Sequence, residues 1–90
     1  MTIEKIEYSK RFIKQFDQLR KNEKLRVIKT IELFRVDPFN KKLRNHQLLG
    51  EFDKYRSISA GGDIRLHYRE KNDAITITFV AIGTHSQLYS

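Results

Sequence analysis

Hydrophobic positions in the first third of the chain follow two different periods. Residues 2–9 alternate isoleucines with charged residues, which predicts a short first strand. After Ser9, a residue type that caps helices, apolar residues recur at the three-and-four spacing of an amphipathic helix. These positions are Phe12, Ile13, Phe16 and Leu19.

A second helix is predicted by the same spacing. Asn22 is its expected cap, and the Asp37–Pro38 pair should end it because proline has no backbone N–H and clashes with the preceding turn. Its apolar positions are Leu25, Ile28, Ile31 and Phe34. Only residues 20–22 separate the two helices, so we expect a helical hairpin with both stripes facing the core. A functional groove along these stripes is the alternative interpretation.

The remaining two thirds of the chain read as strands after a loop. Residues 39–52 show no clear period, and we expect a loop with one turn of helix. Strand-like runs follow at 54–60, 63–70 and 74–82, and the last is apolar on both faces, as in the centre of a sheet. The pattern predicts a single α+β domain over residues 1–90. Its N-terminal strand and two-helix hairpin precede a three-strand antiparallel meander, which completes a four-stranded sheet.

Charge changes this picture by indicating a class of partner. Lys and Arg number 18 against 11 Asp and Glu, a net charge of +7 in 90 residues. Such an excess favours nucleic acid, an acidic protein segment or an anionic surface, although a merely basic solvated surface is the alternative. The chain has no cysteine for disulfides or thiolate metal sites, and no apolar run long enough for a membrane span. It also lacks a charged-then-apolar leader, so a cytoplasmic location is expected.

Residues 63–70 carry candidate chemistry on one face of their strand. Alternation directs Ile64, Leu66 and Tyr68 toward the helices. The opposite face receives Asp63, Arg65, His67 and Arg69. Such a face is often only solvated. Here we expect it to lie near His85, at the end of the next strand, and near His46 in the preceding loop, which favours a functional site.

Four segments, "NHQLLG", "YRSIS", "GGDIRLHY" and "FVAIGTHSQLY", together resemble the RelE/ParE superfamily of bacterial toxins. The pairing of H-x-L-x-G, beginning at His46, with G-T-H-x-x-L-aromatic, ending at Tyr89, is most similar to the YafQ-type branch. The resemblance covers nearly the whole chain. It differs from the branch at Ser59, where members often carry histidine, at Ile64, where an aromatic residue is common, and at Ala81, where arginine is common.

The resemblance implies a RelE-like fold and a ribosome-dependent endoribonuclease that cleaves translated mRNA without a cofactor. The expected partners are mRNA on the 70S ribosome with its rRNA, and a cognate antitoxin that covers the active face. Operator DNA would be contacted only through the antitoxin, and no membrane is expected. The implied catalytic residues are His46, Asp63, Arg65, His85 and Tyr89.

Metal-free RNA cleavage needs a base for the 2′-hydroxyl proton, an acid for the departing 5′-oxygen and cations for the phosphate. Imidazoles suit both proton transfers near neutral pH, and Arg65 offers fixed, permanently charged donors. Asp63 could hold one imidazole in its useful tautomer. Further phosphate contacts are expected from the basic residues Lys41, Lys42, Arg44 and Arg56.

Each candidate has a simpler interpretation. His46 could bond its own backbone, His85 could cap a strand, and Tyr89 could close the core edge instead of stacking on a base. Arg56 could brace the loop through a carboxylate, and His67, without an evident partner, is left outside the catalytic set. A metal site is disfavoured because no two histidines have ligand spacing. The alternative functions are a ParE-like, non-catalytic inhibitor of DNA gyrase and a decayed toxin that only binds its antitoxin.

Overall fold

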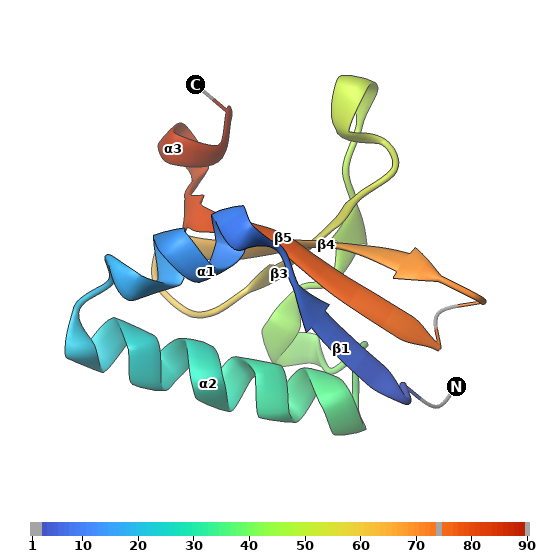
Figure 1. The fold of residues 1–90 in the computed structure, drawn as a ribbon, viewed down its shortest axis with the longest axis horizontal. Coiled ribbons are helices and arrows are strands. Elements are labelled where there is room, and N and C mark those ends of the chain that lie inside the picture. Colours follow the sequence, from blue (N-terminus) through green and yellow to red (C-terminus); the bar gives the residue numbers. More distant parts are fainter. Residues whose placement is uncertain (1–2, 74, 90) are drawn as a thin grey trace.

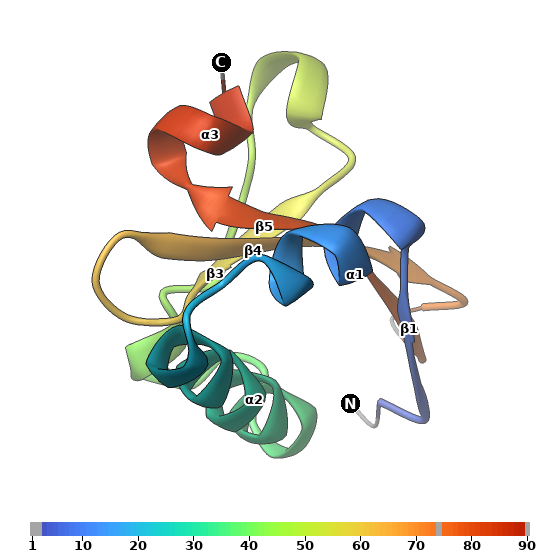
Figure 2. The same ribbon diagram turned by 60° about the vertical axis from the view of Figure 1, so that its left-hand side comes forward.

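A mixed β-sheet carries two helices on one side and a short helix with a loop on the other (Figure 1, Figure 2). The computed structural model describes residues 3–73 and 75–89, so residues 2 and 74 of the predicted strands lie outside the described residues. The strands are β1 (Lys5–Tyr8), β2 (His46–Gln47), β3 (Arg56–Ser59), β4 (Ile64–Lys71) and β5 (Thr76–Thr84). The helices are α1 (Lys10–Asp17), α2 (Lys21–Val36) and α3 (His85–Tyr89), with 3₁₀ turns η1 (Lys41–Leu43) and η2 (Gly50–Phe52).

The predicted α+β class is confirmed, but the predicted strand count is wrong by one. Within residues 3–73 and 75–89 the sheet has five strands in the order β1-β5-β4-β3-β2. β1 runs parallel to β5, and the other neighbours are antiparallel, so the predicted meander is present. The extra strand is β2, whose two residues pair with Arg56 and Ser57 at the sheet edge. A strand of two residues is too short for a periodic signal, which is why residues 39–52 are predicted as a loop with one turn of helix.

Beyond the end of the β1–β5 pairing, helix α1 lies along the edge of β5 and forms hydrogen bonds with it. Ser9 caps the helix as predicted, since its Oγ accepts the N–H of Phe12 at 3.0 Å. The same hydroxyl donates to the carbonyl of Val80 at 2.9 Å, and the Gln15 side chain accepts the N–H of Ile82 at 2.9 Å. These bonds satisfy backbone groups of β5 that would otherwise lack a partner at a sheet edge.

The second helix begins earlier than predicted. It starts at Lys21, and the backbone N–H of Arg20 donates to the Glu23 carboxylate at 2.9 Å, so Asn22 lies in the first turn and is not the cap. The helix ends at Val36, directly before the Asp37–Pro38 pair, as predicted. Among the helices in the described part of the chain, none has the length and apolar character needed to cross a membrane.

An aromatic cluster fixes both helices on one face of the sheet. The ring of Phe34 in α2 lies 4.8 Å from that of Tyr68 and 5.5 Å from that of Phe79. Phe12 in α1 lies 5.6 Å from Phe79. The predicted core side of β4 is confirmed, because Ile64, Leu66 and Tyr68 are all buried. The opposite side of β4 is therefore turned away from α1 and α2.

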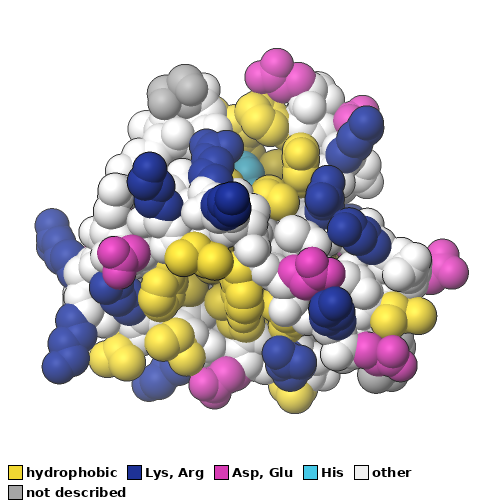
Figure 3. Space-filling model, viewed as in Figure 1, with side chains coloured by type: hydrophobic (Ala, Val, Ile, Leu, Met, Phe, Trp, Pro, Cys, Tyr) yellow, Lys and Arg dark blue, Asp and Glu magenta, His cyan; other side chains and the backbone are white. Residues whose placement is uncertain are grey.

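Three residues predicted to face the core do not. Ile13, Leu25 and Ile28 are 57%, 52% and 44% exposed. Ile13 and Ile28 instead line an apolar groove between α1 and α2, together with aromatic residues of β1 and α1. Hydrophobic side chains gather over these helices on the molecular surface (Figure 3). The stripes are wider than the contact between the helices and the sheet, so their outer residues remain at the surface.

Candidate active site

Cross-strand pairing collects polar residues on the sheet face that α1 and α2 leave open. His46 pairs with Ser57, Ser57 with His67, and His67 with Ala81, which forms one row across four strands. Residues paired in this way project from the same face of a sheet, here the face opposite Leu66 and the core. The structure thus places His46 on the same face as His67. This agrees with the prediction that the polar face of residues 63–70 lies near His46 in the preceding loop.

A second row lies two residues further along the strands. Ser59 pairs with Arg65, and Arg65 with Gly83. Arg65 therefore projects from the same face as His67, one row closer to the end of β5 where His85 follows. The register therefore agrees with the predicted placement of Arg65 and His46 on one face.

Helix α3 folds His85 and Tyr89 back over this face, and it was not predicted. Thr84 and Gln87 form a reciprocal cap: the Thr84 N–H donates to Gln87 Oε1 at 2.9 Å, and the Gln87 N–H donates to Thr84 Oγ1 at 3.2 Å. A side chain on Gly83 would lie 2.9 Å from Gln87 Oε1, so glycine leaves the room that this cap needs. The Thr-x-x-Gln signal is present in the sequence and could have revealed the helix.

The ring of Tyr89 connects the parts of the site. Its centroid lies 4.5 Å from that of His85, one helical turn earlier in α3. It also lies 5.2 Å from the ring of Phe52 in η2 and 5.5 Å from that of His67 on the sheet. The C-terminal helix and the η2 turn therefore meet above the sheet, with His67 beneath them. Both interpretations of Tyr89, base stacking and closing an edge, are compatible with these contacts, since the side chain is 37% exposed.

The sequence placed His67 on this face but did not predict its burial. It was expected on an open face, but it is only 4% exposed, and its Nε2 lies 3.4 Å from the Tyr89 hydroxyl. Burial, together with the smaller effect of the charges of Arg11, His46 and His85, lowers the pKa of His67 from 6.5 to about 4. His67 is therefore neutral at physiological pH. The same charges indicate that His46 and His85 both lie close to it.

The geometry of His46 assigns its tautomer. Its Nδ1 lies 2.8 Å from the carbonyl oxygen of Arg44, and a carbonyl can only accept a hydrogen bond. Nδ1 therefore carries the hydrogen in the neutral ring, and Nε2 keeps a lone pair that can accept a proton. The backbone bond considered as the simpler interpretation is present, and it leaves an exposed imidazole oriented as a base.

Arg65 is anchored to the turn between β3 and β4. Its Nη1 donates to the carbonyls of Gly62 and Ile64, both at 3.0 Å, and to Ser59 Oγ at 3.2 Å. Ser59, the position where the YafQ-type branch often has histidine, thus holds the guanidinium. Asp63 lies exposed in the same turn, and within residues 3–73 and 75–89 it makes no hydrogen bond or ion pair with a histidine.

The predicted RNA-binding residues divide into two groups. Lys41, Lys42 and Arg44 are exposed in or beside η1, close in sequence to His46. Arg56 instead pairs with Tyr68 and so projects from the core side of the sheet. A phosphate bound at the histidine face would therefore meet the first group and not Arg56.

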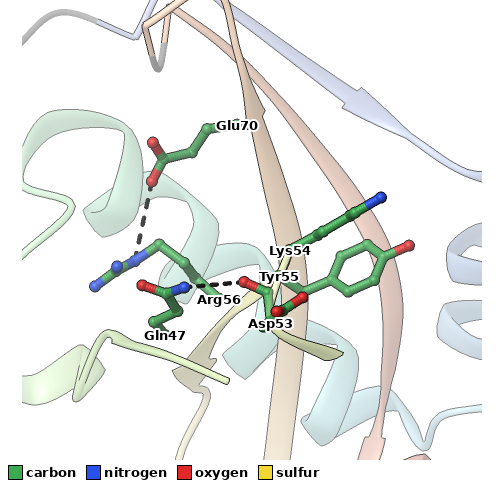
Figure 4. A pocket seen from close by; sticks show the side chains of 6 residues that line it. All are labelled: Gln47, Asp53, Lys54, Tyr55, Arg56 and Glu70. Atoms are coloured by element: carbon green, nitrogen blue, oxygen red, sulfur yellow. Dashed lines mark hydrogen bonds and ion pairs between the residues drawn. The ribbon is translucent and has the colours of Figure 1, made fainter. Parts of the chain in front are cut away.

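Arg56 braces the loop that precedes β2. Its Nε lies 3.9 Å from Glu70 Oε1 (Figure 4). The same Nε donates to Asn45 Oδ1 at 2.8 Å, and the guanidinium stacks over Phe39 at 5.4 Å. Asn45 in turn donates to the Tyr68 hydroxyl at 2.7 Å. The bracing role considered for Arg56 is therefore the one that these contacts support. No group of three or more His, Cys, Asp or Glu residues suited to hold a metal ion occurs in the described part of the chain.

The depressed pKa of His67 predicts a specific dependence of stability on pH. As pH falls from about 6.5 to about 4, the unfolded chain takes up a proton at His67 that the folded chain does not, so the folded state loses stability over that window. The shift corresponds to about 3 kcal/mol at most. In His67→Gln, which cannot titrate, urea unfolding at about pH 7 and about pH 4.5 should show a smaller loss than in the unsubstituted protein. Identical losses in the two proteins would contradict a neutral, buried His67.

Comparisons with known proteins support the fold. YafQ from E. coli strain BL21(DE3) superposes with a TM-score of 0.80 at 23% identity, over 97% of this chain and 99% of that one. YafQ in the E. coli DinJ–YafQ toxin–antitoxin complex gives 0.78 at 23% identity, over 97% and 98% of the two chains.

The archaeal RelE–RelB complex from Pyrococcus horikoshii OT3 gives a TM-score of 0.74 at 19% identity, over 97% of this chain and 99% of that chain. These likenesses confirm the RelE-like fold. No curated protein matches the sequence. The family model described as the bacterial toxin of type II toxin–antitoxin systems, YafQ, matches residues 4–90. The chain therefore belongs to the YafQ family of type II toxins.

Proposed function

We propose that this protein is a ribosome-dependent endoribonuclease that cleaves translated mRNA and thereby inhibits translation and growth. The observation that carries the proposal is the pair of imidazoles, His46 and His85, on either side of the buried, neutral His67. Two histidines of separate elements around one polar face provide a base and an acid for phosphodiester cleavage. Membership of the YafQ family supports the same chemistry.

Residues of this chain supply both proton transfers of the proposed reaction. His46 Nε2 takes the proton of the 2′-hydroxyl, and the resulting oxygen attacks the neighbouring phosphorus. The bond from phosphorus to the 5′-oxygen breaks, and protonated His85 donates its proton to that oxygen. The products are a 2′,3′-cyclic phosphate and a free 5′-hydroxyl. His46 is assigned as the base because its Nδ1 hydrogen bond leaves Nε2 as the acceptor.

Arg65 and Asp63 have supporting roles in the proposal. The guanidinium of Arg65 is fixed by the β3–β4 turn through Nη1, so its other donors are pre-oriented toward charge that develops on the phosphate. Asp63 lies in the same turn and is proposed to orient a histidine once RNA is bound. The exposed Lys41, Lys42 and Arg44 extend the positive surface beside His46 and are proposed to bind the RNA or rRNA backbone.

A cognate antitoxin is the proposed protein partner. The related YafQ and archaeal RelE structures include complexes with DinJ and RelB. The apolar groove between α1 and α2, lined by Ile13, Ile28 and Ile31 among others, is suited to the apolar side of a helix. The net charge of +7 would attract an acidic segment over a long range, whereas the apolar anchors would slow its dissociation.

The central test concerns the two proposed catalytic histidines. His85→Ala should abolish growth arrest, and His46→Ala should weaken it strongly, because each positioned proton transfer contributes about 10²- to 10⁴-fold in rate. Primer extension on mRNA after a brief pulse of expression measures the cuts. Ser86→Ala, an exposed neighbour in α3, is the control and should cut normally.

Unchanged in-frame cutting by His85→Ala, at equal protein level, would remove His85 from the mechanism. Intact transcripts together with blocked replication in the unsubstituted protein would instead favour ParE-like inhibition of DNA gyrase.

The role of Arg65 can be separated from general charge. Arg65→Lys keeps the positive charge but loses the planar fork, so RNA affinity should persist while single-turnover cleavage on programmed ribosomes falls by about 10²- to 10³-fold. Arg35→Lys, the same change at an exposed position in the last turn of α2, should cleave at the original rate. A normal cleavage rate for Arg65→Lys would reduce Arg65 to a structural residue of the turn.

The rate of antitoxin association should depend on charge, and the rate of its dissociation should depend on the apolar groove. Association should slow steeply between about 50 and 500 mM salt while dissociation changes little, since exposed charges are screened over about 8 Å at physiological salt. Ile13→Glu should speed dissociation in stopped-flow measurements, because it places a charge in the apolar groove. Val36→Glu, at a 78% exposed position at the end of α2, is the matched control. An on-rate insensitive to salt would assign the charge excess to RNA or the ribosome instead.

A further inference from the structure

A pocket on the α1 side of the Tyr89–Phe52 contact has no part in the reaction proposed above. Its volume is about 300 Å³, at the lower end of the range for small-molecule sites. Its walls include Phe52 and Tyr55 from the η2 segment, Leu88 from α3, and Arg11 from α1, and His67 also lines it. Figure 3 shows a hollow between hydrophobic surfaces above the helices, with Lys and Arg side chains beside it.

We propose that this pocket binds a single unstacked nucleobase of the RNA, from a nucleotide next to the one that is cleaved. The inference rests on the proposed ribonuclease function and adds a subsite to it. Three features of the pocket carry the proposal: its aromatic walls, its one buried polar group and its contact with the catalytic cluster.

The aromatic walls match the flat faces of a base. Phe52 and Tyr55 are partly buried, and both line the pocket. Stacking on such rings is the usual way in which proteins hold single-stranded RNA, and it contributes about 1–3 kcal/mol per base. An aliphatic ligand would use these walls equally well, so the polar groups decide the ligand class.

The polar groups of the pocket suit a nucleotide. Neutral His67 has one ring donor and one ring acceptor, the combination that the edge of a base requires. Arg11 is exposed and permanently charged, and can pair with a phosphate outside the pocket. Ser9 also lines the pocket, but its hydroxyl already donates to Val80 and accepts from Phe12, so it is not counted as a ligand group.

The pocket and the candidate active site are connected through the ring of Tyr89. The Tyr89 ring lies against the ring of His85 and also against the rings of Phe52 and His67, so it connects His85 to the walls of the pocket. A nucleotide whose phosphate lies at His85 therefore has its neighbour's base within reach of Phe52 and Tyr55. The Tyr89–His67 hydrogen bond is long, at 3.4 Å, so a base could compete for the imidazole without a large loss.

The test measures how much one base contributes to binding. Short oligoribonucleotides made uncleavable by 2′-O-methyl groups are bound to the protein, either intact or with a single abasic nucleotide at each position in turn. We expect one abasic position to weaken binding by about 5- to 100-fold, the equivalent of one stacked base. Tyr55→Leu should bind the intact RNA about as weakly and lose its sensitivity to that abasic position. Tyr55→Phe, which keeps the ring, should retain the sensitivity.

The outcomes distinguish this subsite from the proposed function. Cleavage that continues while every abasic RNA binds as well as the intact one would overturn the pocket and leave the ribonuclease standing. Base-dependent binding that Tyr55→Leu removes, without any cleavage on programmed ribosomes, would support the nucleobase site and reject the ribonuclease. NMR shifts of Tyr55 and His67 on adding a candidate antitoxin, with none on adding RNA, would assign the pocket to a protein partner and overturn the proposal.

Discussion

The pairing of β4 with β5 is the constraint on which the core and the candidate site both depend. The ladder runs from Ile64 opposite Thr84 to Lys71 opposite Thr76, with a register shift between His67 and Tyr68. His67 pairs with Ala81 and Tyr68 with Phe79, so Val80 is the extra residue of a bulge. Tyr68 and Phe79 thereby enter the aromatic core while His67 faces the candidate site. A slip of one residue in this register would exchange the two faces.

The bulge also links the helical hairpin to the site. The Val80 carbonyl accepts a hydrogen bond from the Ser9 hydroxyl, and the oxygen of that hydroxyl also caps α1. Val80 and Ser9 both line the proposed nucleobase pocket. Ser9 therefore bonds to the edge of β5, caps the helix that follows it and forms part of the wall of the pocket. Loss of this hydroxyl would affect helix, sheet and pocket together, so its effects on function would be difficult to separate from its effects on stability.

The parts of the fold that could be predicted from the sequence are those with long periodic signals. The first strand, both long helices and the three meander strands were recognisable, as was the polar face of β4 with Arg65. The short elements were missed for a physical reason: β2 has two residues and α3 has five, less than the length over which periodicity can be read. Only the Thr84–Gln87 cap marked α3, and it lies within the motif that carried the family resemblance.

Tertiary contacts account for the remaining differences at the site. Alternation correctly placed His67 opposite the core, but it could not show that Tyr89 and Phe52 would cover it and remove it from water. The loop reading of residues 39–52 likewise concealed that Asn45 would hold Arg56 on the far side of the sheet. Both cases depend on segments distant in sequence that meet only in the folded chain. The alternation of residues within one β-strand predicts on which face a side chain lies, but not which other segments cover that face.

Helix α1 lies between the two surfaces to which we assign partners. Ile13 belongs to the apolar groove, whereas Arg11 belongs to the pocket beside the histidines. These residues are two positions apart and so project from different sides of the helix. A helix bound in the groove would not need to enter the candidate active site, because acidic residues next to that helix could reach Arg11 around α1. In that arrangement the antitoxin would compete with the RNA phosphate for Arg11 while leaving His46 and His85 unmodified. Inhibition would then be reversible as soon as the apolar anchor dissociates.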